Sequence, residues 1–434
     1  MKIKIDQDSY QYISDNSKEC SPNVAFFHCK QNAKYLQDAK KRSPSKIITP
    51  NELKEIFSLH DLKVVGITGT NGKTTTAAAI YSILLDLGEK VAFAGTRGFF
   101  INDKKIEPKG LTTNPLLSTM FNMYRAIQDG CKYFIMEVSS HAIAQDRIES
   151  LEFALKVFTN ITQDHLDYHG TFDEYKRVKS QFFQDDSLKL INKDATKIDF
   201  NIKNCYTYAI DAPASFNILA YSLNDGITAV IRHFEKKESF YSPLYGSFNL
   251  YNILAAISSV KLLTNYTLQD ISKVVENFAG VSGRMEVISQ RPLIIVDFAH
   301  TPDGMQKVLD SLKEKEIVVV FGAGGDRDKT KRSIMGRVAS RYAKRIYLTS
   351  DNPRNEDPQA IIQDIYQGID KQKQTILEID RKKAIELAID ELQDGEILLV
   401  LGKGDEEFQE IKGKFVRFDD RVVIRAKIKE KFNI

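Results

Sequence analysis

A glycine-rich turn is the segment of this sequence best suited to do chemistry. Residues 66–75 read GITGTNGKTT, follow an apolar run at residues 62–67, and open a helix-like run at residues 73–87. Glycines let backbone N–H groups point at one anion, the start of a helix adds its positive end, Lys73 can neutralise terminal phosphates, and Thr74 can reach Mg²⁺. An ordinary glycine-rich turn between a strand and a helix is the alternative. The pattern favours an ATP site made of Gly69, Thr70, Asn71, Gly72, Lys73, Thr74 and Thr75.

Two further segments carry candidate metal ligands. Glu137 lies in an apolar run at residues 133–138, where its carboxylate would face the crevice at the carboxyl end of a sheet and could hold Mg²⁺. The next apolar run, at residues 157–160, leads into DHLDYHG at residues 164–170, which concentrates two histidines and two aspartates. Taken singly, His141 and His169 are better explained as surface or packing residues. The cluster as a whole indicates a site.

The elements that must position these residues alternate between strands and helices. A second series has strands at residues 293–297, 317–321, 345–349 and 397–401, and helices around residues 302–313, 334–342 and 358–368. Continuous apolar strands separated by helices are typical of parallel sheets covered on both faces. The polar tract at residues 40–50, with two prolines, predicts a linker, and the small residues at 279–284 predict a domain joint.

Composition excludes several classes of protein. The 434 residues exceed the length at which one core stops growing, so two or three domains are expected. A net charge of only +3, from 61 basic and 58 acidic residues, gives no field for sequence-independent binding of nucleic acid. Four scattered cysteines without CxxC spacing argue against a zinc site and a disulfide framework. With no leader pattern and no stretch of about 18 apolar residues, we expect a cytoplasmic protein without a membrane span.

Several motifs together resemble the Mur ligase family. TGTNGKTT is shared with the related folylpolyglutamate synthetases, whereas EVSSHAIAQDR, FTNITQDHLDYHG and TFDEYKRVK are similar, in order, to segments of Mur ligases. The resemblance covers most of residues 62–425. It implies an α/β fold of three domains: a small N-terminal α/β uridine-binding domain at residues 1–61, shorter than the family leads us to expect, a central P-loop ATPase-like parallel-sheet domain at residues 62–283, and a C-terminal Rossmann-like domain at residues 284–434.

The resemblance also implies a reaction and its residues. ATP, with Mg²⁺, would phosphorylate a peptide carboxylate, and an amine would displace phosphate from the acyl phosphate, in the synthesis of peptidoglycan precursors. Lys73, Lys179 and His165 are then the catalytic residues, with Lys179 carbamylated; without the family, Lys179 would be taken for a solvated helix residue. The implied Mg²⁺ ligands are Thr74, Glu137, His165 and Lys179. Further nucleotide contacts are implied for Asn249, Asn252, Arg284, Asp297 and His300.

Substrate choice follows from the same resemblance. The carboxylate substrate would be UDP-N-acetylmuramoyl-L-alanyl-D-glutamate, held by Thr112, Thr113, Ser139, Gln145, Arg147 and Lys179. The DNPR segment at residues 351–354 resembles the form that selects meso-diaminopimelate, because an arginine fork can pair with the carboxylate that lysine lacks; a charged surface turn is the alternative. The implied amino-acid pocket consists of Arg327, Asp351, Asn352, Arg354, Gly402 and Glu406.

Three alternatives exist for the activity, and one feature departs from the family. An L-lysine-adding ligase of the same family and a folylpolyglutamate synthetase would share the loop and the chemistry, whereas a nucleotide-binding module without ligase activity would lack the metal cluster. Asp405 stands where the family commonly has histidine. We expect the chain to act as a monomer.

Overall fold

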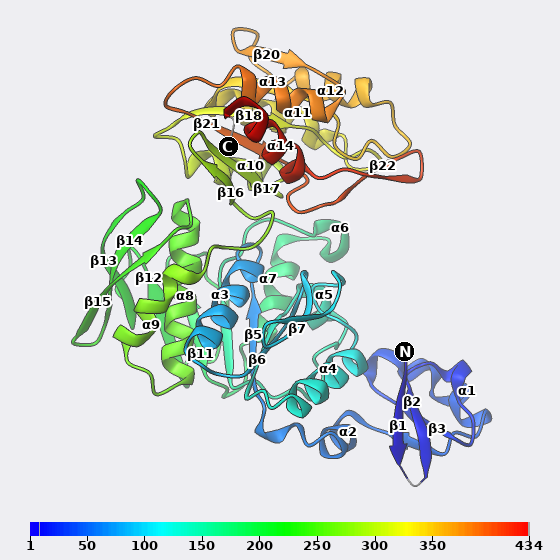
Figure 1. The fold of residues 1–434 in the computed structure, drawn as a ribbon. Helices are drawn as coiled ribbons and strands as arrows, with labels where there is room; N and C mark the ends of the chain where they lie inside the picture. The colour runs from blue at the N-terminus through cyan, green and yellow to red at the C-terminus, as the bar shows by residue number, and fades with distance from the viewer. Residues whose placement is uncertain (8, 433–434) are drawn as a thin grey trace. The chain divides into compact units, whose positions relative to one another are not determined.

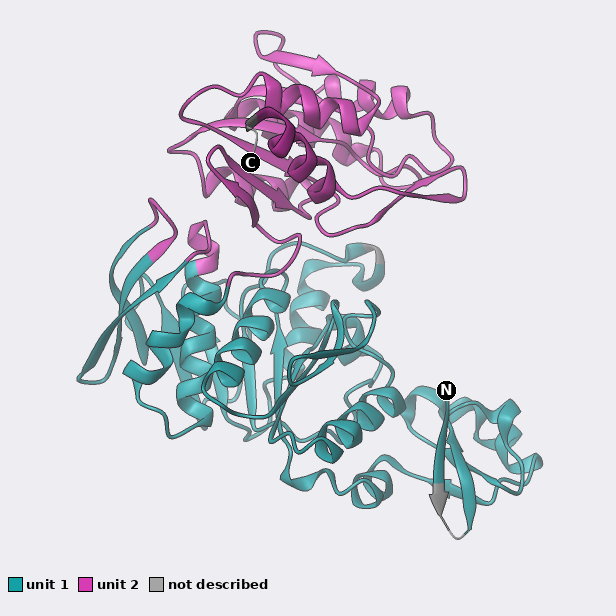
Figure 2. Cartoon of the chain, viewed as in Figure 1, with its two compact units in different colours: residues 1–222, 228–242, 250–278 teal, residues 223–227, 243–249, 279–434 magenta. Residues whose placement is uncertain are grey.

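The computed structural model describes residues 1–7 and 9–432, and it divides into two compact units (Figure 2). Unit 1 comprises residues 1–222, 228–242 and 250–278; unit 2 comprises residues 223–227, 243–249 and 279–434. The predicted joint at residues 279–284 coincides with the start of the main part of unit 2. Residues 1–61 fall in unit 1, and the three predicted domain ranges stay a prediction.

The N-terminal part of unit 1 is a four-stranded sheet in the order β1-β2-β3-β4 (Figure 1). β1 and β2 are antiparallel, whereas β3 runs parallel to β2 and to β4. The linker predicted at residues 40–50 is wrong, because β4 forms within it and Pro50 begins α2 with a capping box from Thr49. The elements are β1 (Lys2–Gln7), β2 (Tyr10–Ser14), β3 (Val24–Phe27), α1 (Leu36–Lys41), β4 (Lys46–Ile48) and α2 (Pro50–Ile56).

The central sheet of unit 1 has eleven strands in the order β15-β14-β13-β12-β11-β10-β5-β9-β6-β7-β8. The strands from β13 to β6 in this order are parallel, and antiparallel pairs join β13 to β14, β6 to β7 and β7 to β8. Because β5 lies between β10 and β9, the segments that follow these three strands meet at one edge of the sheet. This edge carries the phosphate loop.

The elements of the central sheet have these bounds. The first part contains β5 (Lys63–Thr68), α3 (Lys73–Asp86), β6 (Val91–Gly95), β7 (Gly98–Ile101), β8 (Lys104–Glu107), α4 (Leu116–Gln128), β9 (Tyr133–Glu137), α5 (Ser140–Ala144) and β10 (Leu155–Phe158). The second part contains α6 (Leu166–His169), α7 (Phe172–Gln181), β11 (Lys189–Asn192), β12 (Cys205–Ala209), β13 (Phe216–Ser222), β14 (Ile227–His233), β15 (Lys236–Ser242), α8 (Ser247–Leu263) and α9 (Leu268–Val274).

Unit 2 is built on a six-stranded sheet in the order β16-β17-β21-β18-β19-β20, parallel except for β16. Alternate residues of β18 enter two cores: Val319 packs on the side that α10, α11 and α12 cover, and Val318 on the side of α13 and α14. The predicted doubly wound unit is therefore confirmed.

The N-terminal half of unit 2 contains β16 (Glu286–Gln290), β17 (Leu293–Asp297), α10 (Pro302–Asp310), β18 (Glu316–Phe321), α11 (Thr330–Tyr342) and β19 (Ala343–Leu348). The C-terminal half contains α12 (Pro358–Tyr366), β20 (Gln374–Leu377), α13 (Arg381–Asp390), β21 (Glu396–Leu401), β22 (Phe408–Ile411), β23 (Lys414–Arg417) and α14 (Asp420–Phe432).

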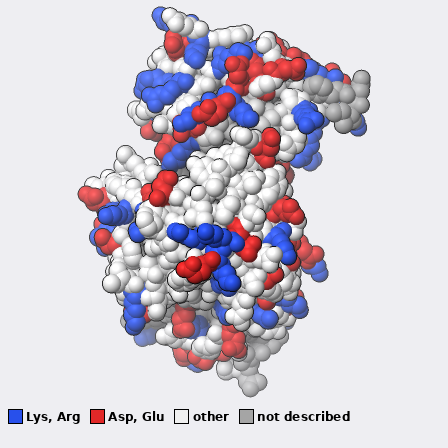
Figure 3. All heavy atoms as spheres, turned by 90° about the vertical axis from the view of Figure 1, so that its left-hand side faces the viewer, with Lys and Arg blue, Asp and Glu red and all other residues white. Residues whose placement is uncertain are grey.

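Basic and acidic side chains are interspersed over the face drawn in Figure 3, as expected from the small net charge. Among the residues that the structure describes, no helix is long and apolar enough to cross a membrane.

Candidate active site

The phosphate loop joins β5 to α3 at the centre of the parallel sheet. Gly72 precedes α3 with a φ of +82°, in the left-handed region that favours glycine. A Cβ there would lie 2.3 Å from Oδ1 of Asn252, which also accepts a hydrogen bond from Thr76 Oγ1 at 3.3 Å. The ammonium of Lys73 donates to the carbonyl oxygens of Gly69 and Thr70, at 2.8 and 2.9 Å. The loop is therefore closely packed against side chains from α3 and α8.

The end of β10 holds the loop from its other side. Asn71 N donates to Asn160 Oδ1 at 3.0 Å, and the backbone carbonyl oxygen of Asn71 accepts from Asn160 Nδ2 and Thr159 Oγ1. Thr70 Oγ1 lies 3.0 Å from the buried Tyr175 hydroxyl and 3.0 Å from the donating Thr162 N. These contacts link the loop to the DHLDYHG segment and to α7.

Glu137 is buried at the end of β9 and forms a polar cluster with two threonines. Its Oε2 accepts hydrogen bonds from Thr74 Oγ1 at 2.8 Å and Thr96 Oγ1 at 3.3 Å, and its Oε1 accepts from Thr96 N at 2.9 Å. A Cβ at Gly95 would lie 2.3 Å from Oε1, so glycine leaves the room that the carboxylate occupies. Thr74 and Glu137, both predicted Mg²⁺ ligands, thus lie side by side with the oxygen donors that Mg²⁺ prefers.

Lys179 lies inside the unit, 1% exposed, so its alternative as a solvated helix residue is wrong. α7 begins at the N-cap Thr171 and carries Lys179 to the loop, where Nζ donates to Gly69 O at 3.0 Å and Thr68 Oγ1 at 3.3 Å. Burial, and next the Lys73 ammonium, lower the pKa of Lys179 well below its usual value, against an opposing effect of Asp164. A lowered pKa favours the neutral amine, which is the form that reacts with carbon dioxide to give the predicted carbamate.

His165 begins α6 in the left-handed region, with a φ of +52°. Its ring centroid lies 5.0 Å from that of His141 and 6.2 Å from that of Tyr175, and its side chain is 45% exposed. His169 is buried, with Nε2 3.0 Å from Ser140 Oγ. Packing therefore accounts for His169, whereas His165 stays accessible to a ligand.

Four of the six residues predicted to hold the muramoyl dipeptide, Thr113, Ser139, Gln145 and Arg147, form one hydrogen-bonded group. Arg147 donates through Nη1 to Thr113 O at 2.8 Å and through Nε and Nη2 to Gln145 Oε1 at 3.0 and 2.6 Å. Thr113 Oγ1 accepts from Ser139 N at 3.0 Å, and Thr112 Oγ1 lies 3.1 Å from Thr96 Oγ1. This group borders the Glu137 cluster.

A cavity of about 260 Å³ joins these groups in unit 1. It is lined by residues of the phosphate loop, the predicted dipeptide site and the predicted metal site. The lining residues among those predicted are Gly69, Lys73, Thr112, Thr113, Ser139, Arg147, His165 and Lys179. Residues that the sequence assigned to three separate sites therefore line one cavity, and their binding of substrates stays a prediction.

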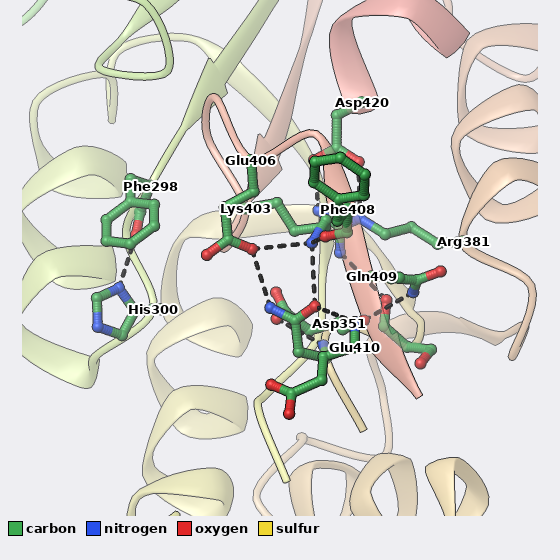
Figure 4. A network of polar contacts seen from close by, with 12 residues as sticks. Phe298, His300, Asp351, Arg381, Lys403, Glu406, Phe408, Gln409, Glu410 and Asp420 are labelled. Carbon is green, nitrogen blue, oxygen red and sulfur yellow. Dashed lines mark hydrogen bonds and ion pairs between the residues drawn. The ribbon is translucent and has the colours of Figure 1, made fainter. Parts of the chain in front are cut away.

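The remaining predicted nucleotide residues lie in unit 2, apart from Asn252. Burial raises the pKa of Asp297, whose two oxygens accept from Met285 N and Ala299 N at 2.7 Å each. His300 Nδ1 lies 2.9 Å from Phe298 O (Figure 4), and the Arg284 guanidinium lies 4.6 Å from the centre of the Phe298 ring. Asn249 is buried, and its Nδ2 donates to Tyr245 O at 2.8 Å. Their contacts with a nucleotide stay predictions.

The predicted amino-acid pocket gathers at the carboxyl end of the second sheet. Asn352 Nδ2 donates to Glu406 Oε2 at 2.9 Å, and a Cβ at Gly402 would lie 2.5 Å from Asp351 Oδ2. This buried Oδ2 has no hydrogen-bond partner within residues 9–432. Arg327 is exposed in the loop that follows β18. Five of the six predicted residues thus follow β19 or β21.

Arg354, the residue expected to select diaminopimelate, is already partly engaged. It adopts a φ of +50°, donates through Nε to Glu410 Oε2 at 2.9 Å and through Nη1 to Gly325 O at 2.8 Å. Its Nη2 has no hydrogen-bond partner among the described residues. The guanidinium is therefore oriented, with one nitrogen left to meet a ligand.

Comparison with known proteins identifies the family. Residues 67–260 match the Mur ligase middle domain, and residues 283–404 match the Mur ligase glutamate ligase domain. A protein of Wolinella succinogenes named UDP-N-acetylmuramoyl-L-alanyl-D-glutamate–2,6-diaminopimelate ligase is 52% identical over 430 residues, 99% of each chain. The chain belongs to the Mur ligase family. A Helicobacter pylori protein of the same name is 50% identical, covering 96% of this chain and 95% of its own.

A solved structure of UDP-N-acetylmuramoyl-L-alanyl-D-glutamate–2,6-diaminopimelate ligase is also similar to this Mur ligase. Its TM-score is 0.74 at 28% sequence identity, with 100% of both chains covered. The predicted family, its α/β fold with N-terminal, central and C-terminal domains, and its ATP-dependent ligase chemistry are confirmed. The short N-terminal region is shared with the Wolinella relative, since that match covers nearly all of both chains.

Sequence reasoning missed several residues of this Mur ligase's candidate site. Thr96 follows the short strand β6 and belongs to no motif, although it donates twice to Glu137. Tyr175 stands in the quoted TFDEYKRVK segment, but only the fold brings its hydroxyl to Thr70. Lys403 is adjacent to the predicted Gly402, and that proximity was the one available signal. Within the described residues, no three His, Cys, Asp or Glu side chains converge to hold a metal ion.

Proposed function

We propose that this protein joins meso-diaminopimelate to the D-glutamate of UDP-N-acetylmuramoyl-L-alanyl-D-glutamate, with ATP as the energy source, in peptidoglycan precursor synthesis. Two relatives at 52% and 50% identity, matched over nearly their whole length, carry the name of this activity. The single observation that carries the mechanism is the cavity of unit 1, which unites the phosphate loop with Arg147 and Lys179. We also propose that a single chain works in the cytoplasm.

The first step is phosphoryl transfer to the substrate carboxylate. Backbone N–H groups at the start of α3 and the Lys73 ammonium bind phosphate oxygens, and both favour the charge that develops on the transferred group. Arg147, fixed on Gln145, offers a cation to an acidic group of the muramoyl dipeptide. The carboxylate attacks the terminal phosphorus, ADP leaves, and an acyl phosphate remains. The chain's part is to orient the two reactants and stabilise charge.

Thr74 and Glu137 would hold Mg²⁺, with His165 and the carbamate of Lys179 as further ligands. The hydroxyl and the carboxylate fit this ion because they are hard oxygen donors 2.8 Å apart beside the phosphate loop. When bound, the ion supplies positive charge at the phosphoryl group. A carbamate on Lys179 replaces a repelling cation with an anionic oxygen ligand, and the buried neutral amine is the form that can make it.

The second step is attack of an amine on the acyl carbon, with release of phosphate. The zwitterionic far end of meso-diaminopimelate needs a cation and an anion side by side, and Arg354 with Glu406 supplies them. Lysine has no second carboxylate for Arg354. Diaminopimelate is therefore favoured over lysine as the added amino acid. The names of the two relatives favour this ligase over a folylpolyglutamate synthetase.

The test measures phosphate release from ATP with the UDP-linked dipeptide and either meso-diaminopimelate or L-lysine. We expect release that depends on diaminopimelate, and in Arg354→Ala a KM for diaminopimelate raised about 10- to 100-fold, as for a lost charged hydrogen bond. Arg425→Ala is the control, because Arg425 is exposed and its one ion pair among the described residues is with Glu286. Equal turnover of lysine would refute the selectivity, and no amine-dependent release would refute the ligase assignment.

A further inference from the structure

A fully buried lysine lies at the centre of the amino-acid pocket and belongs to none of the predicted site residues. Lys403 follows Gly402 after β21 and has a relative exposure of 0%. Its Nζ donates to Phe408 O at 2.7 Å, Glu406 Oε2 at 2.9 Å and Asn352 Oδ1 at 3.2 Å (Figure 4). Three acceptors match the three N–H bonds of an ammonium, which would otherwise be too costly to bury.

Two of the three acceptors are side chains of the predicted pocket. The carboxamide of Asn352 has one orientation that satisfies its neighbours: Oδ1 accepts from Lys403 Nζ and Glu410 N, and Nδ2 donates to Glu406 Oε2. Glu406 Oε2 is therefore engaged twice, by a cation and by an amide. Its Oε1 has no hydrogen-bond partner within the described part of the chain, and the side chain is 34% exposed. Oε1 is the atom left to meet a ligand.

Lys403 also joins the two loops that form the pocket. Asn352 follows β19, whereas Glu406 and Phe408 lie beyond β21, and these strands are not neighbours because β18 separates them. Gln409 Nε2 adds a second link by donating to Asp351 O at 2.7 Å. Removing the ammonium would leave a carboxylate, an amide oxygen and a carbonyl without their common donor.

We infer that Lys403 is a positioning residue for the incoming amino acid: it fixes Asn352 and Glu406 so that Glu406 Oε1 is presented to the substrate's ammonium group. The inference rests on the proposed function and names a residue that acts through its neighbours. A purely structural lysine would change stability alone. A positioning lysine changes the KM for the amino acid more than the KM for ATP or for the UDP-linked dipeptide.

The experiment compares Lys403→Met, which keeps the side-chain length, with Lys403→Arg, which keeps the charge but replaces three divergent donors with a planar fork. Arg345→Met is the matched control. Arg345 is also a buried cation of unit 2, and its Nη2 donates to Glu396 Oε2 and Glu391 O. Arg345 lies near the amino end of β19, whereas Asn352 follows the carboxyl end of the same strand. All variants are checked for folding by circular dichroism and thermal unfolding.

Phosphate release is measured while ATP, the UDP-linked dipeptide and meso-diaminopimelate are varied in turn. We expect Lys403→Met to raise the KM for diaminopimelate about 10- to 100-fold, the range for hydrogen bonds to charged groups. The other two KM values should stay within about twofold. Arg345→Met should lower the unfolding temperature and leave all three KM values unchanged. In a Lys403→Met background, Glu406→Gln should raise the KM for diaminopimelate little further, because both changes disrupt the same interaction of Glu406 with the substrate.

An unchanged KM for diaminopimelate in a folded Lys403→Met protein, or an equal rise of all three KM values, overturns the inference. If Lys403→Met does not fold, Lys403→Arg carries the test, with a selective rise of the same KM expected and its absence overturning the inference. Absence of diaminopimelate-dependent release by the unaltered protein would overturn the proposed function and this inference together. Normal release with unchanged KM values in the variants overturns the inference alone.

Discussion

Gly72→Ala gives the sharpest test of the phosphate loop, because the chain contains its own control. Gly72 and Gly88 stand just before and just after α3, with φ values of +82° and +84°. A Cβ at Gly72 would lie 2.3 Å from Asn252 Oδ1, whereas a Cβ at Gly88 would meet no atom of the described residues beyond its chain neighbours within 4 Å. The two substitutions therefore share the backbone strain and differ in the contact.

The expected magnitudes follow from these two terms. A left-handed backbone costs a residue other than glycine about 1–2 kcal/mol, which is the whole effect expected for Gly88→Ala. Gly72→Ala adds the cost of overpacking, about 1–3 kcal/mol, because Asn252 is buried and held by Thr76. We therefore expect Gly72→Ala to lower the free energy of unfolding by about 2–5 kcal/mol in total.

Urea unfolding measures the stability of both variants, and calorimetric titration measures ATP binding. Gly72→Ala should weaken ATP binding, because the N–H groups that bind phosphate move with the loop, and Gly88→Ala should leave ATP binding intact. Adding Asn252→Ala to Gly72→Ala should recover the overpacking part of the stability. Equal stability loss in the two alanine variants, or full ATP affinity in Gly72→Ala, would refute the packing described for the loop.

Three further predictions concern charged side chains. The unaltered protein should show a carbamate resonance by NMR in ¹³C-labelled bicarbonate, and Lys179→Met should remove this resonance and abolish phosphate release. Hydrogen bonds from Arg332 lead the effects that lower the pKa of Glu356 to about 2, so this carboxylate stabilises the fold above pH 4.5 and the contribution disappears between about pH 4.5 and 2. Glu356→Gln should flatten the dependence of urea unfolding on pH in that window. Arg381 and Asp420 form a fully buried ion pair, and Asp420→Asn should cost about 3–5 kcal/mol by urea unfolding, more than replacement of both residues by apolar ones.

The parts of the fold that the sequence predicted are those with strong local signals. α3 was expected at residues 73–87 and runs Lys73–Asp86, because a glycine turn and a terminal glycine bound it. The strand expected at residues 157–160 is β10, Leu155–Phe158, displaced by two residues because Lys156, which interrupts the apolar run, is buried within the strand. The strands β11 to β15 were not predicted at all. They are four to seven residues long, and β14 and β15 reach the parallel sheet only through the antiparallel strand pairing that follows β13.

The candidate site was predicted where residues near in sequence stay near in space. The phosphate loop is of this kind, whereas the dipeptide group, in which Arg147 contacts Thr113 from 34 residues away, was predicted through the family resemblance. Contacts between residues far apart in sequence could not be predicted. Glu410 pairs with Arg354 from 56 residues away, and Asn252 of α8 packs on Gly72. Arg354 was expected to wait for a carboxylate of the substrate, but a carboxylate of the chain already orients it. Nothing in the DNPR segment indicates that partner.

Two buried lysines show why burial alone does not decide what a charged residue does. Lys179 has a hydroxyl and a carbonyl oxygen as its acceptors and the Lys73 ammonium nearby, so burial and repulsion both favour loss of its proton. Lys403 is as deeply buried, but it has a carboxylate at 2.9 Å and two further acceptors, and only an ammonium has enough donors for all three. The first environment suits an amine that reacts, and the second suits a cation that holds its neighbours in place. The same residue type therefore has opposite electrostatic environments in the two units, and the difference lies in which oxygens the fold brings to the nitrogen.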